Sequence, residues 1–375
     1  MRIAVPSESD KTETRVAATP DTVKRFVALG AEVVVQAGAG KLSRIPDADY
    51  RDAGAEIAKS AKATWEGADI VLKVRRPNAT ELKNCAPGTA VVGIMDPYDD
   101  TDALAAMAEA KVDAFAMEFM PRITRAQVMD VLSSQANLAG YRAVIDGAAE
   151  FDRALPMMMT AAGTVPAAKI FVMGAGVAGL QAIATARRLG AIVTATDVRP
   201  AAKEQVESLG AKFVAVEDDE FRQAETAGGY AKEMSDEYKA KQAELVASHI
   251  AKQDMVITTA LIPGRPAPKL VTKAMVKTMT PGSVLVDLAV ERGGNVEGSV
   301  AGKVADVHGC KVIGHVNVAG RIAATASLLY AKNLYAFVET WIDKDAKAIA
   351  INWEDELVSA TNLTRDGKIV HPAFA

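Results

Sequence analysis

The first third of the chain alternates between short apolar runs and amphipathic segments. The runs are five or six residues long and rich in β-branched residues, as in buried strands, and they lie at 2–6, 32–36, 70–74, 90–95 and 114–119. Between them, residues 20–29 and 101–110 repeat apolar side chains at helical spacing, and the first of these segments starts with proline and is followed by Gly30. This alternation predicts a parallel sheet with helices on both faces.

A second alternating region follows a long helical segment at about 124–148. Its strands are predicted at 170–173, 192–196, 212–216, 255–259, 284–288 and 311–313, and another long helix at about 323–341 comes after them. The pattern therefore predicts an α/β fold of two Rossmann-like, doubly wound parallel-sheet domains joined by long helices. We expect residues 1–132 and 325–375 to form the first domain, completed by the C-terminal tail, and 133–324 the second.

A glycine-rich turn follows the first strand of the second domain. Gly174 permits a tight turn, Gly176 lets a pyrophosphate approach the backbone, and Gly179 lets the next helix pack closely on the sheet. The following strand ends at Asp197, an acid that can accept hydrogen bonds from a ribose and repel a 2′-phosphate. The cofactor is therefore predicted to be NAD(H) rather than NADP(H). Arg199, two residues further on, would instead favour NADP(H). An arginine after such a strand is commonly a solvated surface charge, so we give Asp197 more weight.

Two further segments of this domain invite interpretation. Residues 157–159 are three consecutive methionines, which we expect to pack beneath the second domain rather than to form a binding surface. Residues 217–244 are rich in charge and contain Gly-Gly-Tyr230, followed by a charged helix from about 231. We interpret 217–240 as a mobile flap with apolar contacts through Tyr230 and Met234; a solvated linker is the alternative.

Composition excludes several classes of protein. The chain has 375 residues, a net charge of −4 and no basic stripe with interleaved aromatics, which argues against nucleic-acid binding. The two cysteines are far apart, and neither they nor the four histidines have metal-ligand spacing, so we expect no disulfide framework and no metal. The N-terminus leads directly into a strand, and no stretch reads as a membrane span, so we expect a soluble chain.

Several long motifs resemble the NAD(H)-binding subunit of proton-translocating nicotinamide nucleotide transhydrogenase, within the alanine dehydrogenase/transhydrogenase superfamily. They lie at 122–135, 137–144, 157–166, 227–234, 258–264 and 287–291, and the similarity extends over nearly the whole chain. The resemblance implies that NAD(H) binds to the second domain and exchanges hydride with NADP(H) on a partner β subunit, while membrane-spanning subunits couple the transfer to proton translocation. It also implies a homodimer, peripheral on the cytoplasmic face of the inner (plasma) membrane through its partner subunits.

The resemblance also assigns site residues. A catalytic set in the domain cleft matches Arg122, Gln127, Asp130 and Ser133. The cofactor-binding positions are Gly174, Gly176, Val177, Ala178, Gly179, Asp197, Val198, Arg199, Tyr230, Met234, Thr259, Ala260 and Leu261. Gln127, Asp130 and Ser133 are spaced by three residues, so on the predicted helix they would share one face. The alternative is that they form an ordinary polar face of an exposed helix.

Two other functions remain open. An alanine dehydrogenase-like enzyme would need basic anchors for a carboxylate, a histidine and an aspartate. Arg15 and Lys73 occupy the anchor positions, but the strand that should lead to the histidine ends at Asp96, and Glu291 takes the place of the aspartate. We therefore expect Arg15 and Lys73 to form structural ion pairs. A non-catalytic NAD(H)-sensing module is the second alternative, since binding a dinucleotide does not require chemistry.

Overall fold

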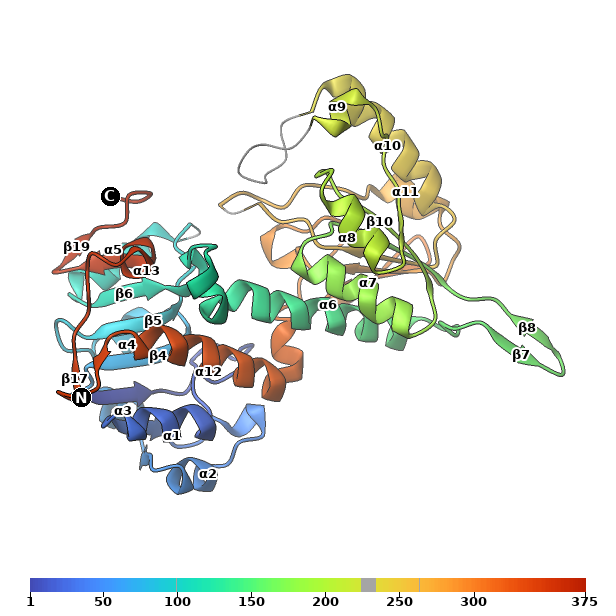
Figure 1. The fold of residues 1–375 in the computed structure, drawn as a ribbon. Helices are drawn as coiled ribbons and strands as arrows, with labels where there is room; N and C mark the ends of the chain where they lie inside the picture. Colours follow the sequence, from blue (N-terminus) through green and yellow to red (C-terminus); the bar gives the residue numbers. More distant parts are fainter. Residues whose placement is uncertain (99, 224–233, 263) are drawn as a thin grey trace. The chain divides into compact units, whose positions relative to one another are not determined.

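The computed structural model describes residues 1–98, 100–223, 234–262 and 264–375. They form two compact units: unit 1 consists of Met1–Gln135 and Ala319–Ala375, and unit 2 of Ala136–Val318. Each unit is a central, mainly parallel sheet flanked by helices (Figure 1). The predicted fold class, two Rossmann-like α/β domains, is confirmed.

Unit 1 contains a sheet with the strand order β19-β18-β6-β5-β4-β1-β2-β3. The strands are β1 (Arg2–Val5), β2 (Glu32–Gln36), β3 (Glu56–Ala58), β4 (Ile70–Arg75), β5 (Ala90–Ile94), β6 (Asp113–Ala116), β18 (Asn362–Arg365) and β19 (Lys368–Ile369). Strands β1 to β6 pair in parallel, whereas β18 runs antiparallel to β6 and β19 antiparallel to β18. The C-terminal tail thus extends the sheet of the N-terminal segment.

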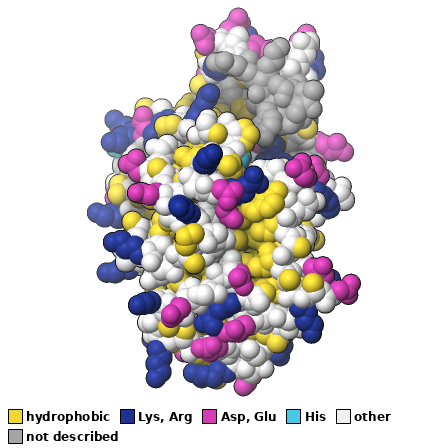
Figure 2. Space-filling model, turned by 90° about the vertical axis from the view of Figure 1, so that its left-hand side faces the viewer, with side chains coloured by type: hydrophobic (Ala, Val, Ile, Leu, Met, Phe, Trp, Pro, Cys, Tyr) yellow, Lys and Arg dark blue, Asp and Glu magenta, His cyan; other side chains and the backbone are white. Residues whose placement is uncertain are grey.

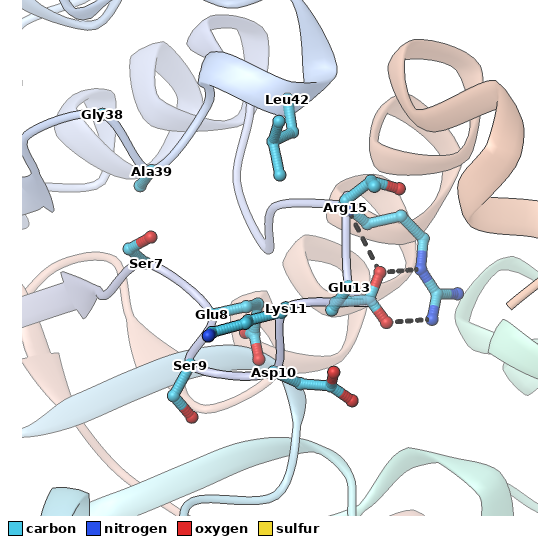
Figure 3. Close-up of a pocket in the computed structure, with 11 residues that line it drawn as sticks. Ser7, Glu8, Ser9, Asp10, Lys11, Glu13, Arg15, Gly38, Ala39 and Leu42 are labelled. Atoms are coloured by element: carbon cyan, nitrogen blue, oxygen red, sulfur yellow. Dashed lines mark hydrogen bonds and ion pairs between the residues drawn. The ribbon is translucent and has the colours of Figure 1, made fainter.

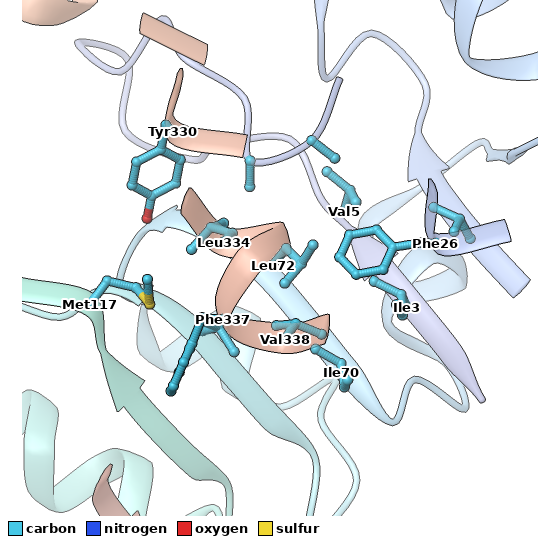
Figure 4. Close-up of a cluster of buried hydrophobic side chains, with 14 of the residues drawn as sticks. Ile3, Val5, Phe26, Ile70, Leu72, Met117, Tyr330, Leu334, Phe337 and Val338 are labelled. Carbon is cyan, nitrogen blue, oxygen red and sulfur yellow. The ribbon is translucent and has the colours of Figure 1, made fainter. Parts of the chain in front are cut away.

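The helices of unit 1 connect these strands and cover the sheet. They are α1 (Pro20–Ala28), α2 (Asp47–Asp52), α3 (Ala61–Trp65), α4 (Ala79–Leu82), α5 (Thr101–Glu109), α12 (Ala323–Glu339) and α13 (Glu356–Thr361), with 3₁₀ turns at η1 (Lys41–Ser43), η2 (Met117–Phe119), η3 (Thr124–Met129) and η5 (Ala319–Ile322). A short hairpin, β16 (Ile342–Asp343) and β17 (Ala348–Ile349), follows α12. Helix α12 buries Leu334, Phe337 and Val338 against Ile70 and Leu72 of β4 (Figure 4), so the returning segment supplies part of this core.

Unit 2 has a sheet with the order β11-β10-β9-β12-β13-β15-β14. Its strands are β9 (Lys169–Met173), β10 (Ile192–Thr196), β11 (Lys212–Phe213), β12 (Met255–Thr258), β13 (Val284–Asp287), β14 (Lys303–Val307) and β15 (Cys310–Gly314), and only β14 is antiparallel to its neighbour. If β14 is left out and the other six strands are numbered in chain order, the order across the sheet is 3-2-1-4-5-6, which is the dinucleotide-binding arrangement. The strand order reverses between β9 and β12, and this switch point is where such folds bind their ligand. Met173 is in register with Thr196 and Thr258, so the three strands end at one edge.

The helices of unit 2 lie around this sheet. They are α7 (Val177–Arg188), α8 (Ala202–Ser208), α9 (Asp219–Arg222), α10 (Asp236–Ile250) and α11 (Lys273–Thr278), with a 3₁₀ turn at η4 (Val290–Arg292). Helix α6 (Val131–Glu150) begins in unit 1 and continues into unit 2.

Two sequence predictions are wrong in detail. The helix predicted at 124–148 is interrupted, because η3 ends at Met129 and Asp130 has extended backbone angles before α6 begins. The methionine run does not pack beneath the domain: strands β7 (Met158–Thr160) and β8 (Gly163–Val165) form a separate hairpin that projects from unit 2 (Figure 1), and Met159 is 81% exposed. A run of apolar residues predicts burial only where a surface is available to cover it.

Charge on the surface and candidate spans or metal groups can be examined for the described residues. On the face shown in Figure 2, basic and acidic side chains are interspersed, with hydrophobic side chains exposed between them, so that face carries no patch of one charge. Within the described part of the chain, no helix is long and apolar enough to cross a membrane. The same residues contain no group of histidine, cysteine or acidic side chains arranged to hold a metal ion.

Candidate functional site

The turn between β9 and α7 requires glycine at two positions. Gly174 has φ +104°, and a Cβ there would lie 2.5 Å from Thr259 Oγ1. A Cβ on Gly179 would lie 1.7 Å from the carbonyl oxygen of Gly174, so the first turn of α7 packs directly on the end of β9. Both positions shape the turn, as expected for a dinucleotide fingerprint.

Gly176 differs from its two neighbours in the motif. A Cβ at Gly176 would meet nothing within 4 Å, and its φ of −76° suits any residue. Gly176 is the N-cap of α7, and no side chain caps that end of the helix. The end of the helix is thus left uncapped at the exposed Val177 and the partly buried Ala178, and its first-turn N–H groups and positive dipole suit a pyrophosphate.

Asp197 follows β10 at the same edge of the sheet. Its Oδ2 accepts a hydrogen bond from the N–H of Ala175 at 2.7 Å, and its Oδ1 accepts one from the N–H of Arg199 at 2.9 Å. The Arg199 guanidinium also pairs with this carboxylate, donating from Nε to Oδ1 at 2.9 Å and from Nη2 to Oδ2 at 3.1 Å. Val198, between them, is exposed. The acid predicted to meet the ribose is thus tied to the glycine-rich turn and to Arg199.

The segment after β12 forms the other side of the switch point. Thr259 donates a hydrogen bond from Oγ1 to the Gly174 carbonyl at 3.0 Å and so fastens this segment to the turn. Asn295 holds Ala260 through both backbone groups, accepting from its N–H at 3.0 Å and donating to its carbonyl at 2.9 Å. Leu261, the next residue, is 52% exposed and open to a ligand.

Two groups at this edge were missed by sequence reasoning. The buried Asp287 at the end of β13 accepts hydrogen bonds from the N–H groups of Asn295 (3.1 Å) and Val296 (3.0 Å), which in turn places Asn295 beside Ala260. A Cβ on Gly140 of α6 would lie 2.0 Å from the carbonyl of Ala178, so α6 packs tightly on the start of α7. Neither role leaves a periodic signal in the sequence.

The insertion after β11 is described only in part. Tyr230 lies outside the described residues. Met234 is partly buried and packs against the core of unit 2, just before α10. Ser235 begins that helix, since its Oγ accepts from the N–H of Tyr238 at 3.1 Å and donates to Glu220 at 2.7 Å.

The four predicted catalytic residues lie in unit 1, around the start of α6. The Asp130 carboxylate caps this helix: it accepts from the N–H of Ser133 at 2.8 Å and from the Ser133 hydroxyl. Gln127 lies on η3 and is exposed, so it does not share one helical face with the other two. Arg122 is also exposed and has no hydrogen-bond or ion-pair partner among the residues that the structure describes. The structure therefore brings Asp130 and Ser133 together and leaves Arg122 and Gln127 available to a ligand.

The predicted ion pairs of Arg15 and Lys73 are confirmed. Arg15 is buried and pairs with Glu13 at 2.7 Å, while the fully buried Lys73 pairs with Glu81 at 2.7 Å and with Glu8 at 3.3 Å. Figure 3 shows the Glu13–Arg15 pair in the wall of a small cavity of about 130 Å³. Both cations are already neutralised within unit 1.

The pKa values of two acids that pair with these cations, Glu13 and Glu8, are shifted in opposite directions. Burial alone would raise the pKa of Glu13, but the hydrogen bonds and charge of Arg15, with the charge of Arg75, lower it to about 2. Burial raises the pKa of Glu8 despite the opposing charge of Lys73. Glu13 is thus a firmly ionised partner that stabilises the charge on Arg15.

The fold and the glycine-rich turn define a two-domain Rossmann-type protein. Comparison with known families makes the assignment specific: the alanine dehydrogenase/PNT N-terminal domain matches residues 4–139, and the C-terminal domain of the same family matches 143–372. The chain belongs to the alanine dehydrogenase/PNT family.

Similar proteins carry transhydrogenase names. A Rhodospirillum rubrum protein named as a part of NAD(P) transhydrogenase subunit alpha is 55% identical over 379 residues, covering 100% of this chain and 99% of that protein. NAD(P) transhydrogenase subunit alpha of Cereibacter sphaeroides is 44% identical, covering 99% of this chain and 71% of that protein. The crystal structure of transhydrogenase from Sinorhizobium meliloti matches with a TM-score of 0.90 and 63% identity, covering 99% of this chain and 100% of that one.

Proposed function

We propose that this protein is the NAD(H)-binding subunit of a transhydrogenase, in which NADH bound to unit 2 gives hydride to NADP⁺ bound to a partner subunit. The observation that carries the proposal is the edge of the unit 2 sheet, where the open Gly176, the free N-terminus of α7 and Asp197 lie together at the switch point. A pyrophosphate fits the first two features and a ribose the third. The transhydrogenase names of the relatives support the acceptor.

Hydride transfer between two nicotinamides does not require a general acid or a general base from the protein. One hydride leaves the nicotinamide of NADH and joins that of NADP⁺, so one ring is oxidised, the other is reduced, and no proton is moved. The protein must hold the rings close together, orient them and exclude water. We assign this orientation to Arg122, Gln127, Asp130 and Ser133: the first two have free donors, and the Asp130–Ser133 pair fixes the start of α6.

Amino-acid oxidation is a weaker interpretation of the same fold. It needs an acid–base group beside a carboxylate anchor. Asp96 stands where the resemblance would put a histidine, and Glu291 is engaged with the N–H of Asn317 at 3.0 Å. Arg15 and Lys73 are both occupied by internal carboxylates. These contacts favour a protein whose second reactant is another nucleotide.

The assembly proposed for this chain is a homodimer bound to a NADP(H)-binding β subunit and to membrane-spanning subunits, which hold it on the cytoplasmic face of the membrane and couple transfer to proton translocation. The hairpin of β7 and β8 supports contact with a second copy. Among the described residues its two strands pair only with each other, and Met157, Met158 and Met159 are all exposed. An isolated two-stranded hairpin is marginally stable in water, so it benefits from a covering surface.

The test is reconstitution with the partner. The purified chain is mixed with the NADP(H)-binding subunit of a transhydrogenase, and hydride transfer from NADH to an NADP⁺ analogue is followed by absorbance. We expect transfer that needs both proteins and falls at least about 100-fold in Gln127→Ala, because positioning errors are costly for hydride transfer. Absence of transfer with any such partner, together with alanine-dependent reduction of NAD⁺ by the chain alone, would refute the proposal.

A further inference from the structure

The carboxylate of Asp197 has no acceptor position to spare. A carboxylate can accept about four hydrogen bonds, two at each oxygen. Oδ1 takes the backbone N–H and the Nε of Arg199, and Oδ2 takes the N–H of Ala175 and the Nη2 of Arg199. The side chain of Asp197 is also only 7% exposed.

The four donors fall into two kinds. The N–H groups of Ala175 and Arg199 belong to the backbone, one for each oxygen, and they fix the orientation of the carboxylate. The other two belong to the guanidinium of Arg199, again one for each oxygen, and this side chain is 33% exposed. Its Nη2 also donates a longer hydrogen bond to the Ala175 carbonyl at 3.3 Å, which would be broken together with the ion pair. The guanidinium can therefore leave while the carboxylate stays in place.

We infer that the Arg199 guanidinium occupies the place of the ribose diol and must leave Asp197 when NAD(H) binds. Its departure frees one acceptor position on each oxygen. A ribose diol brings two hydroxyl donors on adjacent carbons, which match these two positions. This inference rests on the proposed function, because it concerns how the same site admits its nucleotide.

Displacement of Arg199 has a consequence for specificity. Breaking a bidentate, charge-assisted pair costs free energy that the ribose hydrogen bonds must offset, so Arg199 weakens NAD(H) binding. Once displaced, the guanidinium remains tethered two residues from Asp197 and can pair with a 2′-phosphate. Arg199 is thus a specificity-determining residue that narrows the preference for NAD(H) over NADP(H).

The test compares Arg199→Met, which keeps much of the side chain's length but has no donors, with the unmodified full-length chain. Dissociation constants for NADH and NADPH are measured by fluorescence titration, and folding is checked by thermal melting. We expect Arg199→Met to bind NADH about threefold to tenfold more tightly and NADPH no more tightly than the unmodified chain. Arg188→Met is the matched control: it removes the same charge from the last turn of the 12-residue α7, roughly 16 Å along the axis, and should leave both constants unchanged.

A double-mutant cycle ties the effect to Asp197. In an Asp197→Asn background, where the ion pair is lost, Arg199→Met should give no gain in NADH affinity. Arg199→Lys keeps the charge but not the bidentate geometry and should lie between the unmodified chain and Arg199→Met. Weaker or unchanged NADH binding by Arg199→Met overturns the inference while leaving the proposed function standing. Failure of the unmodified chain to bind NADH at all refutes the proposed function, and the inference with it.

Discussion

At the scale of single residues, Lys73 shows what a buried charge contributes. Its ammonium lies between Glu81 and Glu8 with no exposure to solvent. We expect Lys73→Met to lower the free energy of unfolding by about 3–5 kcal/mol, because two carboxylates then lose their buried counter-charge. The measurement is urea unfolding followed by tryptophan fluorescence. All three tryptophans, Trp65, Trp341 and Trp353, belong to unit 1, so this signal reports the unit that contains Lys73.

The control for this prediction is Lys62→Met, at an exposed position of the same unit, which should change stability by less than about 0.5 kcal/mol. Lowering the pH should narrow the difference between Lys73→Met and the unmodified chain, since protonated carboxyls no longer need a counter-charge. Equal unfolding midpoints and slopes for the Lys73 variant and the unmodified chain would show that the ion pairs contribute nothing net.

Glu118 gives unit 1 a dependence on pH. Its carboxylate accepts hydrogen bonds from the N–H groups of Met95 and Asp96, but burial raises its pKa from 4.5 to about 7. Between these values the folded protein holds a proton that the unfolded chain releases, so this group's contribution is fully present below pH 4.5 and is lost as pH rises towards 7. Glu118→Gln should therefore make stability fall less steeply from about pH 5 to pH 7, by tryptophan-monitored unfolding at each pH. The exposed Glu66→Gln should leave the slope unchanged.

At the scale of elements, the β9–α7 turn separates two roles of glycine. A Cβ at Gly179 collides with the Gly174 carbonyl, whereas a Cβ at Gly176 meets open space. We expect Gly179→Ala to lower the melting temperature of unit 2, seen by circular dichroism as a transition that tryptophan fluorescence does not report. Gly176→Ala should melt normally and yet weaken NADH binding about tenfold or more, because its methyl group enters the space proposed for the pyrophosphate. Equal effects of the two substitutions on melting would contradict this division.

The segment after β12 depends on one side chain, that of the buried Asn295. It bonds both backbone groups of Ala260 and donates to the carbonyl of Pro268 at 2.8 Å. Asn295→Ala leaves these three groups without their partner, so we expect a loss of about 1–3 kcal/mol in unit 2 stability and weaker NADH binding. Calorimetry and nucleotide titration measure the two effects. Asn352→Ala, at an exposed turn of unit 1, should alter neither.

Elements whose boundaries are set by neighbouring residues could be predicted from sequence, whereas elements that depend on contacts with other parts of the fold could not. Strand β10 begins and ends where its apolar run does, at Ile192 and Thr196, because the turn residues around it act locally. Strand β14 was missed, since its largely exposed residues pair only with the edge of β15. The break before α6 was also missed: Asp130 is compatible with a helix locally, and its capping of Ser133 decides the boundary.

The candidate site likewise has features that sequence could predict and features that it could not. Residue types and spacing were sufficient to indicate the turn and Asp197, because each follows directly from a strand end. The contacts that govern access could not be predicted, since the guanidinium of Arg199 and the amide of Asn295 reach their partners only through side-chain conformation and tertiary packing. Sequence thus indicates which groups are available, and packing decides which of them are already engaged.

At the scale of the whole molecule, the nucleotide site and the proposed dimer contact are separate features of unit 2. The groups that shape the described portion of the site are Gly174, Asp197, Thr259 and Asn295, all held by contacts within one chain. The hairpin of β7 and β8 contributes none of these contacts. We therefore expect dissociation of the dimer to leave NADH affinity unchanged.

Adding positive charge to the hairpin surface tests this separation. Replacing Met158 and Met159 together by lysine places two cations on the exposed hairpin, so burying it against a second copy would require desolvating them. Sedimentation velocity should show a dimer for the unmodified chain and a monomer for the double variant, with equal NADH titrations. Val300→Lys, at another exposed apolar position of unit 2, should remain dimeric. A monomeric unmodified chain would refute the homodimer. A double variant that stays dimeric would place the contact elsewhere, and one that dissociates and also loses NADH would show that the second copy completes the site.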